Sequence, residues 1–567
     1  MKYDNFETAI YFTVYDLLDV EAVSKVEDFL NFVEKHIKVS KVYLETFRCS
    51  QDIGKEKIEK FKRFFHEKGI KTSGGITTSV MGTHDWEFKS LCYTNPEHLN
   101  QLEKIVEFTA KMFDEIILDD FYFTNCKCPS CIKAKGNKSW SEFRTELMKT
   151  VSQNIVLNTA RKVNPEINTI IKFPNWYDNY QATGYNLKEQ FKQFDMLYTG
   201  TETRNPDFTQ QALQRYTGYF LMRYLENVKP NNNLGGWFDG FDCMYNIGSY
   251  VEQAYMTLFA KAKEVTLFCA GTLMSEQKIL IPVIGHVFNE LDKFLDKLGS
   301  PIGLKCYKPF NSSGEDYIHG YLGMLGIPLE PDAKFDTKAS TILLTESAKK
   351  DNKIVDKIKT SLNNGNNVII TSGLLKELPS QNIESIIELE ATSKKSLVNQ
   401  FACNMQKCAF KNYYQSNKKV LIPQINFNTN DCWQIIVGMG ESKNFPILLE
   451  AEYGKGTLYV LAVPDNFGDF YNLPDDVLNK IREILLSDLY VRIEGPSKIG
   501  LFVYDNNTFI IESFLQFNSD IKIVINREDA HLVNYSDNKD LNGTNVYGKT
   551  VFTVDLEPAS YKVFKLN

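Results

Sequence analysis

The chain has 567 residues, too many for a single hydrophobic core, so we expect two to four domains. Its 43% hydrophobic and 24% charged residues are typical of a folded globular protein. The net charge of -7 argues against nucleic acid or an anionic membrane surface as the main partner.

The N-terminal segment and the cysteine pattern indicate the compartment. Residues 1–20 lack the basic stretch and small-residue cleavage site of a secretory signal peptide. No apolar run approaches the length of a membrane span. The 11 cysteines are scattered, unlike those of a small disulfide scaffold. We therefore expect a cytoplasmic protein.

Short strand-like runs alternate with helical patterns over roughly the first half of the chain. The runs lie at 9–14, 41–47, 70–76, 115–120, 168–173, 194–200, 235–241 and 265–271. Short runs alternating with helices predict a parallel sheet, and eight such units fit a (β/α)8 TIM barrel. A doubly wound open sheet is the alternative, but no GxGxxG or GxxxxGK[ST] loop follows the first run.

The pattern changes after residue 300. Runs at 341–347 and 367–373 flank a helical pattern and predict an α/β domain over residues 301–490. From 491 onward, short strand patterns and turn residues occur with no helical pattern, which predicts a small antiparallel β-sandwich. The segment DNNT at 505–508 is expected to form a hairpin turn.

Charged, amide and aromatic residues follow the ends of five predicted strands. In a TIM barrel the active site lies at the carboxyl ends of the strands, so these residues should meet. They are Glu45, Arg48, Asp119, Asp120, Lys172, Asn175, Trp176, Glu202, Arg204, Trp237, Asp239 and Asp242. Such acids can also cap a helix or pair with an arginine. Because so many gather at one end, we interpret them as an active site.

This set matches the needs of glycosidic bond cleavage. One carboxylic acid protonates the leaving oxygen, and a second carboxylate acts as nucleophile or activates water. The residues expected to bind the sugar are Glu45, Lys172, Asn175, Trp176, Arg204, Trp237 and Asp242. No GxSxG elbow is present, which argues against a serine nucleophile.

The catalytic groups are expected among Asp119, Asp120, Glu202 and Asp239. Because side chains alternate along a strand, Asp119 and Asp120 should face opposite sides, with Asp120 at the barrel mouth. We favour Asp120 as one catalytic group and Glu202, which lies in the segment TGTETR, as the other. Asp239 is the alternative partner or a ligand-binding acid.

The segment CKCPSC spaces Cys126, Cys128 and Cys131 as C-x-C-x2-C. Thiolates at this spacing can close around one Zn²⁺ with a fourth ligand. Cys92 follows the third run, and adjacent loops of a barrel face are neighbours, so we expect it to be that ligand. Four thiolates would make a structural site that anchors the loop after strand four. The alternative is a set of reduced cysteines without metal.

These features resemble glycoside hydrolase family 42, the bacterial β-galactosidases and their relatives. In that family a barrel is followed by an α/β domain similar to glutamine amidotransferases, used for trimer formation, and by a small β-domain. The resemblance implies a catalytic barrel over 1–300, an amidotransferase-like domain over 301–490 and a β-sandwich over 491–567. It also implies structural zinc at the four cysteines, a carbohydrate substrate and a homo-oligomer, either dimer or trimer.

The catalytic positions differ from those of the family. Family 42 carries an Asn-Glu pair after strand four, where this chain has Asp119-Asp120, and a nucleophilic glutamate after strand seven, where GGWFDGFDC offers only aspartates. We therefore predict a divergent barrel glycosidase that acts on small oligosaccharides or glycosides without a catalytic cofactor. The alternatives are a non-catalytic sugar-binding protein and a lyase or isomerase acting on sugar acids.

Overall fold

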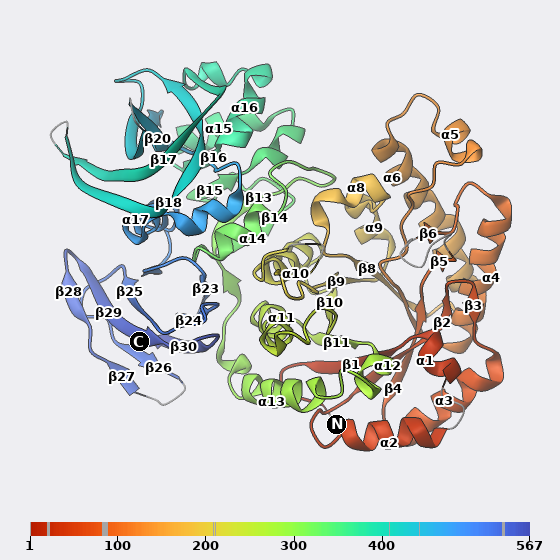
Figure 1. Ribbon diagram of the computed structural model, residues 1–567. Helices are drawn as coiled ribbons and strands as arrows, with labels where there is room; N and C mark the ends of the chain where they lie inside the picture. The colour runs from red at the N-terminus through yellow and green to blue at the C-terminus, as the bar shows by residue number, and fades with distance from the viewer. Residues whose placement is uncertain are drawn as a thin grey trace. The chain divides into compact units, whose positions relative to one another are not determined.

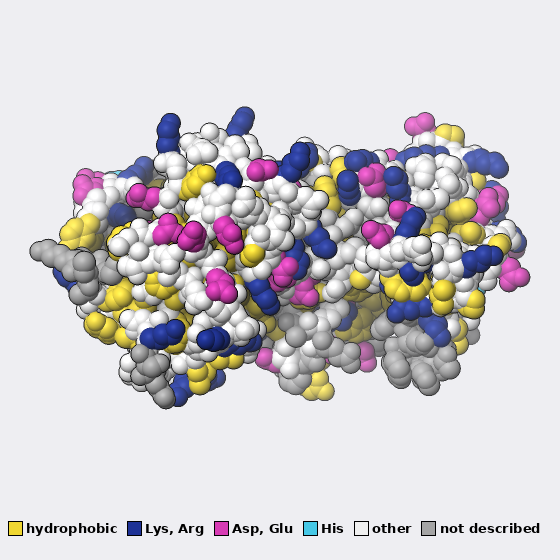
Figure 2. All heavy atoms as spheres, turned by 90° about the horizontal axis from the view of Figure 1, so that it is seen from above, with side chains coloured by type: hydrophobic (Ala, Val, Ile, Leu, Met, Phe, Trp, Pro, Cys, Tyr) yellow, Lys and Arg dark blue, Asp and Glu magenta, His cyan; other side chains and the backbone are white. Residues whose placement is uncertain are grey.

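The computed structural model describes residues 2–19, 23–81, 89–207, 209, 211, 213–406, 409–440, 443–535 and 539–567. They form two compact units, Met1–Asp296 and Lys297–Asn567. Within these ranges, no helix is long and apolar enough to cross a membrane. Basic and acidic side chains are interspersed on the face that Figure 2 shows, in keeping with the small net charge.

The first unit is a closed barrel of parallel strands, as predicted (Figure 1). The strands are β1 (Glu7–Phe12), β2 (Lys41–Arg48), β4 (Lys71–Ile76), β7 (Glu115–Leu118), β8 (Asn168–Phe173), β9 (Met196–Gly200), β10 (Asn233–Asp239) and β11 (Glu264–Phe268). β1 pairs in parallel with both β2 and β11, which closes the sheet. This closure excludes the open doubly wound sheet, and all eight predicted strands are confirmed.

Helices connect successive strands and cover the barrel (Figure 1). They include α2 (Val23–Val33), α3 (Lys55–Glu67), α4 (Pro96–Met112), α6 (Trp140–Val151), α7 (Asn158–Val163), α9 (Leu187–Gln193), α10 (Thr217–Val228), α11 (Ile247–Phe259) and α13 (Leu280–Asp292). In α3 the buried residues are Ile58, Phe61, Phe64 and Phe65. This spacing puts them on one face of the helix, and burying that face stabilises the helix against the sheet.

A buried ion cluster lies at the amino end of the barrel. Lys41 and Glu264, the first residues of β2 and β11, pair at 3.1 Å, and Lys41 also pairs with Glu115 at the start of β7. The Tyr43 and Tyr198 hydroxyls donate to Glu264 at 2.8 and 3.0 Å. These buried charges therefore have partners supplied by the protein itself.

The second unit contains a mixed sheet with helices, which confirms the predicted α/β domain. Its parallel strands are β13 (Leu304–Tyr307), β14 (Leu329–Asp332), β15 (Thr341–Leu344), β16 (Asn367–Thr371) and β21 (Gly456–Leu461). Antiparallel strands extend it, namely β17 (Leu389–Gln406), β18 (Ala409–Phe427), β19 (Trp433–Met439) and β20 (Asn444–Tyr453). The long pair β17 and β18 was not predicted, because these strands are rich in polar residues and their apolar stretches, such as 420–423, are short.

Two antiparallel sheets follow and share one apolar core, which confirms the predicted sandwich. The main strands are β22 (Val491–Glu494), β23 (Ile499–Tyr504), β24 (Thr508–Ser513), β25 (Ser519–Ile525), β29 (Lys549–Leu556) and β30 (Tyr561–Leu566). β23 and β24 pair as the predicted hairpin. β12 (Pro301–Ile302) pairs with β23, so residues just after 300 join a sheet of the sandwich.

Replacing Lys41 with methionine should lower the free energy of unfolding by about 3–5 kcal/mol, because Glu264 and Glu115 would stay buried without their cation. Urea unfolding followed by tryptophan fluorescence measures this, since four of the five tryptophans lie in residues 1–296. The control is Lys68→Met, which breaks a partly exposed pair with Glu27 and should cost less than about 1 kcal/mol. Equal losses of stability in the two variants would contradict the role of Lys41 as the cation that compensates Glu264 and Glu115.

Candidate active site

Lys172, near the end of β8, is the centre of a buried charge cluster at the carboxyl ends of the strands. Its Nζ lies 2.9 Å from Asp120 Oδ2, 3.3 Å from Glu202 Oε1 and 3.6 Å from Asp119 Oδ1. The ring of Trp237 faces the same ammonium, with its centroid 4.2 Å from Nζ. The cluster thus joins residues from β8 and β10 with residues that follow β7 and β9, as the sequence predicted.

Asp119 and Asp120 both lie close to Lys172, so the prediction that they face opposite sides of the strand is wrong. β7 ends at Leu118, and side chains alternate regularly only within an extended strand. Asp119 Oδ1 accepts the Asp120 N–H at 2.7 Å in the turn that follows. The Tyr185 hydroxyl donates to the Asp120 carbonyl at 2.6 Å and holds this turn.

Arg48 and Glu45 support Asp119 from the end of β2. Arg48 Nη2 donates to Asp119 at 3.0 Å, and Arg48 Nε donates to Glu45 at 2.9 Å. The Thr77 hydroxyl, directly after β4, lies within hydrogen-bond distance of both Asp119, at 3.1 Å, and Glu45, so its one proton can be donated to either. Glu45 is fully buried and accepts from Tyr11 as well, so it holds Arg48 in place instead of presenting a carboxylate to a sugar.

Glu202 reaches Lys172 from the segment after β9. A Cβ at Gly200 would lie 2.8 Å from Glu202 Oε2, so glycine leaves the room that this carboxylate occupies. Asn175 Nδ2 donates to the Glu202 carbonyl at 2.6 Å. Glu202 Oε2 is buried and has no hydrogen-bond partner among the described residues. A buried polar atom in this state needs a partner from outside the chain, such as water or a ligand hydroxyl.

Asp239, at the end of β10, is held by Arg204. Arg204 Nε and Nη2 donate to the two Asp239 oxygens at 2.9 and 2.8 Å, and the Phe241 N–H adds a bond at 3.1 Å. Arg204 adopts the left-handed conformation with φ of 55°, and its N–H donates to Gln253. A bidentate pair of this kind neutralises both groups, so Asp239 differs from Glu202.

Four further predicted residues lie near these acids or on the same strand ends. Asn175 is buried and Trp176 half-buried, and Asn175 Oδ1 and Trp176 Nε1 have no partner within the described ranges. Trp237 is only 2% exposed and packs in the aromatic core, so it supports Lys172 and offers no open face for stacking on a sugar. Asp242 is exposed in the loop after β10.

The carboxyl groups of the cluster differ in the direction in which their pKa values are shifted. Burial opposes ionisation of Asp119, but the charges of Lys172 and Arg48 hold its pKa below the usual value. Burial, together with Asp119 and Glu202, raises the pKa of Asp120 to about 7 against the pull of Lys172. Burial also raises the pKa of Glu202. Burial thus favours the neutral forms of Asp120 and Glu202, whereas two cations favour the ionised form of Asp119.

Asp120 and Glu202 lie at a separation that is informative about mechanism. Since their nearest oxygens are 2.9 and 3.3 Å from one nitrogen, these oxygens are at most about 6 Å apart. Retaining glycosidases place their two carboxyl groups roughly 5–5.5 Å apart, and inverting enzymes roughly 6.5–9.5 Å. The upper limit on the nearest oxygens is compatible with the retaining arrangement.

The four predicted cysteines meet as well. The sulfurs of Cys92, Cys126, Cys128 and Cys131 lie within 4.8 Å of one another and could hold a metal ion. Cys92 Sγ is 3.7 Å from Cys128 Sγ and 3.6 Å from Cys131 Sγ. A tetrahedron with metal–sulfur bonds of about 2.3 Å needs sulfurs about 3.8 Å apart, so the spacing fits. The cluster ties the segment after β4 to the one after β7.

Sequence reasoning missed Thr77, Tyr185 and Gln253, which position the acids. Thr77 directly follows the third predicted strand, so the rule of reading strand ends could have found it. Tyr185 and Gln253 act from helical connections, where no residue pattern marks them.

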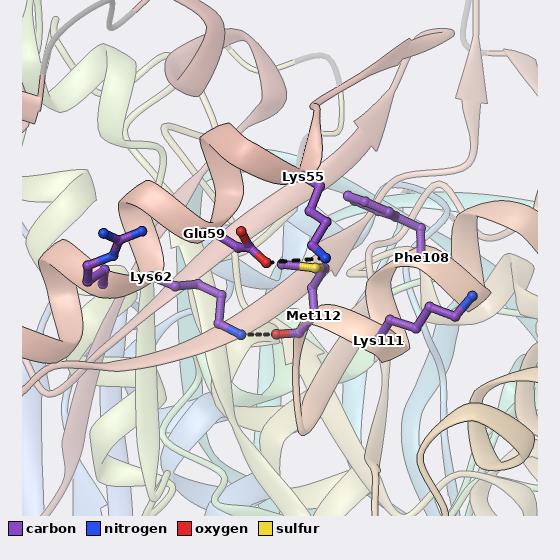
Figure 3. A pocket seen from close by; sticks show the side chains of 7 residues that line it. Lys55, Glu59, Lys62, Phe108, Lys111 and Met112 are labelled. Carbon is purple, nitrogen blue, oxygen red and sulfur yellow. Dashed lines mark hydrogen bonds and ion pairs between the residues drawn. The ribbon is translucent and has the colours of Figure 1, made fainter.

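A separate hollow lies between α3 and α4, in the helical layer of the first unit (Figure 3). Its volume is about 440 Å³, and it is lined by Lys55, Glu59, Lys62, Arg63, Phe108, Lys111 and Met112. Lys62 donates to the Met112 carbonyl, and Lys55 pairs with Glu59 at 3.5 Å. Since these cations are engaged with groups of the protein itself, we assign no chemistry to this hollow.

Comparison with known proteins indicates the class of protein to which this chain is similar. Residues 1–282 match the family model "Probable glycosyl hydrolase, catalytic domain", and residues 490–566 match "Probable glycosyl hydrolase, C-terminal domain". Two parts of the chain thus match the catalytic and C-terminal domains of a probable glycosyl hydrolase. Residues 299–466 match the second domain of an uncharacterized protein, SSO3021. That protein, from Saccharolobus solfataricus, is 25% identical over 539 residues, 86% of this chain and 87% of its own length.

Solved structures share the fold over the full length. The β-galactosidase of Bacillus circulans sp. alkalophilus has a TM-score of 0.66 at 10% identity, with 100% of both chains covered. The family 42 β-galactosidase Gan42B of G. stearothermophilus also has a TM-score of 0.66 at 10% identity, covering 100% of this chain and 99% of its own. Alpha-L-fucosidase isoenzyme 2 of Paenibacillus thiaminolyticus has 0.65 at 12%, with 100% of both chains covered. The family 42-like three-domain architecture is confirmed.

Replacing Lys172 with methionine should destabilise the protein more at pH 8 than at pH 5. A carboxyl group whose pKa is raised by folding contributes stability at low pH that is lost as the pH rises through the raised value. Without the Lys172 cation, ionising the buried Asp120 and Glu202 costs more. The free energy of unfolding should therefore fall by about 3 kcal/mol or more at pH 8.

Urea unfolding at the two pH values measures this difference. The control is Lys111→Met, which removes an exposed helical partner of Glu107 and should cost little at either pH. The same deficit for Lys172→Met at pH 5 and pH 8 would show that the lysine does not compensate these acids.

Proposed function

We propose that the chain is a retaining glycosidase that hydrolyses neutral glycosides with Asp120 and Glu202. The observation that carries the proposal is the pair of buried carboxyl groups on one lysine, one of which keeps an oxygen without a partner among the described residues. The matched glycosyl hydrolase catalytic domain, which spans this site, supports the same class of reaction.

The two carboxyl groups differ in a way that suits different roles. Asp120 lies nearer to Lys172, at 2.9 Å, and this cation opposes the burial that raises the pKa of Asp120 to about 7, so the ionised form that a nucleophile needs is populated at neutral pH. Glu202 is buried beside Asp239 and leaves Oε2 available, which suits a protonated general acid. Attack by Asp120 on the anomeric carbon would displace the aglycone oxygen as Glu202 protonates it. Glu202 would then deprotonate the water that releases the sugar.

The charges of the site favour a neutral sugar. Arg48, Lys172 and Arg204 are each engaged with carboxylates of the chain. A uronic acid would therefore add an anion to a site whose cations are already matched. Asn175 Oδ1 and Trp176 Nε1, each without a partner in the described part of the chain, are suited to sugar hydroxyls.

The named similar structures include β-galactosidases and an α-L-fucosidase. Their names cover two sugars and both anomeric configurations. A screen of 4-nitrophenyl α- and β-glycosides of galactose, glucose and fucose therefore comes first. NMR of the product anomer formed from the accepted glycoside then tests retention.

Asp120→Asn and Glu202→Gln should each lower kcat by about 10³-fold or more, because each removes one of the two carboxyl groups. For a substrate with an activated leaving group, added azide should restore turnover of the Glu202 variant. Glu166→Gln, at an exposed acid before β8, is the control and should keep full activity. Circular dichroism and the melting temperature confirm that each variant is folded.

Near-normal turnover by both Asp120→Asn and Glu202→Gln would contradict the assignment of these two residues as the catalytic groups. If Asp239→Asn abolished turnover while Glu202→Gln did not, the second catalytic group would be Asp239. Binding of sugars without turnover of any glycoside would favour a non-catalytic sugar-binding protein.

We infer that the four cysteines hold a structural Zn²⁺. All four ligands would be thiolates, and a closed set of this kind is typical of structural zinc. When bound, the ion would hold the segments after β4 and β7 together. The second of these segments begins with Asp119 and Asp120, so the metal would stabilise the site without taking part in the reaction.

Elemental analysis of purified protein should find about one Zn²⁺ per chain. Cys128→Ser should lower both the metal content and the melting temperature, because one ligand is lost. Cys432→Ser, a cysteine of the second unit, should leave the metal content unchanged. Metal-free wild-type protein of undiminished stability would contradict the zinc assignment.

A further inference from the structure

Exposed apolar side chains of the first unit gather on one side of the barrel. Within its described residues, the large apolar side chains classed as exposed are Tyr15, Met81, Ile132, Phe241, Met244, Tyr245 and Ile279. Each lies between the carboxyl end of a barrel strand and the helix that leads to the next strand. These segments form the catalytic face of a TIM barrel. The exposed apolar surface therefore lies on the face that carries the charge cluster.

Five of these residues lie in the segments that follow three adjacent strands of the barrel, β10, β11 and β1. We call them the apolar rim: Tyr15, Phe241, Met244, Tyr245 and Ile279. They are between 37% and 81% exposed.

Close contacts link the segments that carry the rim. Gly240, beside Phe241, has no room for a Cβ because Gln277 and Leu280, on either side of Ile279, pack against it. Gly271, in the segment between β11 and Ile279, lies in the same way against Asp16, the neighbour of Tyr15. The rim segments therefore form one continuous border of the barrel mouth.

Phe241 connects this rim to the charge cluster. The Arg204 guanidinium lies 5.5 Å from the Phe241 ring, and the Phe241 N–H donates to Asp239 at 3.1 Å. Phe241 also packs against Phe268, at the end of β11, with ring centroids 6.2 Å apart. A ligand that extends from the acids across Arg204 would thus meet apolar side chains.

We propose that the apolar rim is the subsite for an apolar aglycone. The proposal rests on the proposed function and defines its substrate further: the sugar occupies the charged side of the mouth, and an alkyl or aryl group lies on the rim. A second sugar would require hydrogen-bonding partners, whereas the rim offers apolar surface. Five side chains are also far fewer than the roughly 20–30 residues per side of a stable protein interface, so a small group fits better than a second copy.

The test compares hexyl and methyl glycosides of whichever sugar the wild-type protein accepts. Both leaving groups are simple alcohols, so their chemistry is similar and the difference reports on apolar contact. We expect kcat/KM for the hexyl glycoside to be at least about tenfold higher, since burying two methylene groups is worth about that factor. The double variant Met244→Ser/Ile279→Ser should bring this ratio close to one while the methyl glycoside is cleaved as before.

The matched control is Leu397→Ser, which removes an apolar side chain of the second unit that is 53% exposed, against 51% for Ile279. It should leave the hexyl to methyl ratio at the wild-type value. A wild-type ratio near one, or a ratio unchanged in the double variant, would overturn the subsite. A double variant whose oligomeric state changes in size-exclusion chromatography while the ratio stays the same would instead identify the rim as an interface between copies.

Calorimetric titration with the same two glycosides separates this inference from the proposed function. Tighter binding of the hexyl glycoside, lost in the double variant, without hydrolysis of any glycoside would support the subsite and reject the glycosidase. Hydrolysis without a hexyl preference would retain the glycosidase and reject the subsite.

Discussion

The buried charge of Lys172 is the constraint on which the site depends. An ammonium removed from water is stable only when anions and aromatic faces replace its hydration, and here Asp119, Asp120, Glu202 and the Trp237 ring do so. The dependence is mutual, because buried carboxyl groups near one another cannot all ionise without a cation. One lysine at the end of β8 thereby fixes the position of acids from two other strand ends.

Two of the buried ion clusters among the described residues of the barrel differ in whether their hydrogen bonds are satisfied. At the amino end, Glu264 is bonded to Lys41, Tyr43 and Tyr198. At the carboxyl end, Glu202 Oε2 has no partner among the described residues. A cluster whose hydrogen bonds are supplied by the protein stabilises the fold. A cluster with an orphaned buried oxygen is arranged for something the protein does not supply.

Periodicity in the sequence predicted the elements because burial imposes it. Most barrel strands are short runs of apolar and β-forming residues, and helices such as α3 carry buried residues three or four positions apart. Strand ends also predicted which acids would meet, since parallel strands of a barrel share one carboxyl face. The turn at Asp119 and Asp120 could not be predicted, because alternation stops where β7 ends. Nor could the sequence show that Glu45 and Trp237 are buried supports, since this depends on neighbours from other strands.

The pairing of Asp239 with Arg204 separates this acid from the two carboxyl groups that lie on Lys172. A short, bidentately bound aspartate stands after strand seven, where family 42 has its nucleophilic glutamate. Both oxygens of this aspartate accept guanidinium N–H groups, and one also accepts a backbone N–H, so its lone pairs are engaged within the chain. The longer Glu202, one strand earlier, occupies space left by Gly200 and reaches the same lysine as Asp120. The barrel allows the two carboxyl groups to come from different pairs of strands. Every strand ends at the same mouth, so carboxyl groups after strands four and six can face each other as well as those after strands four and seven.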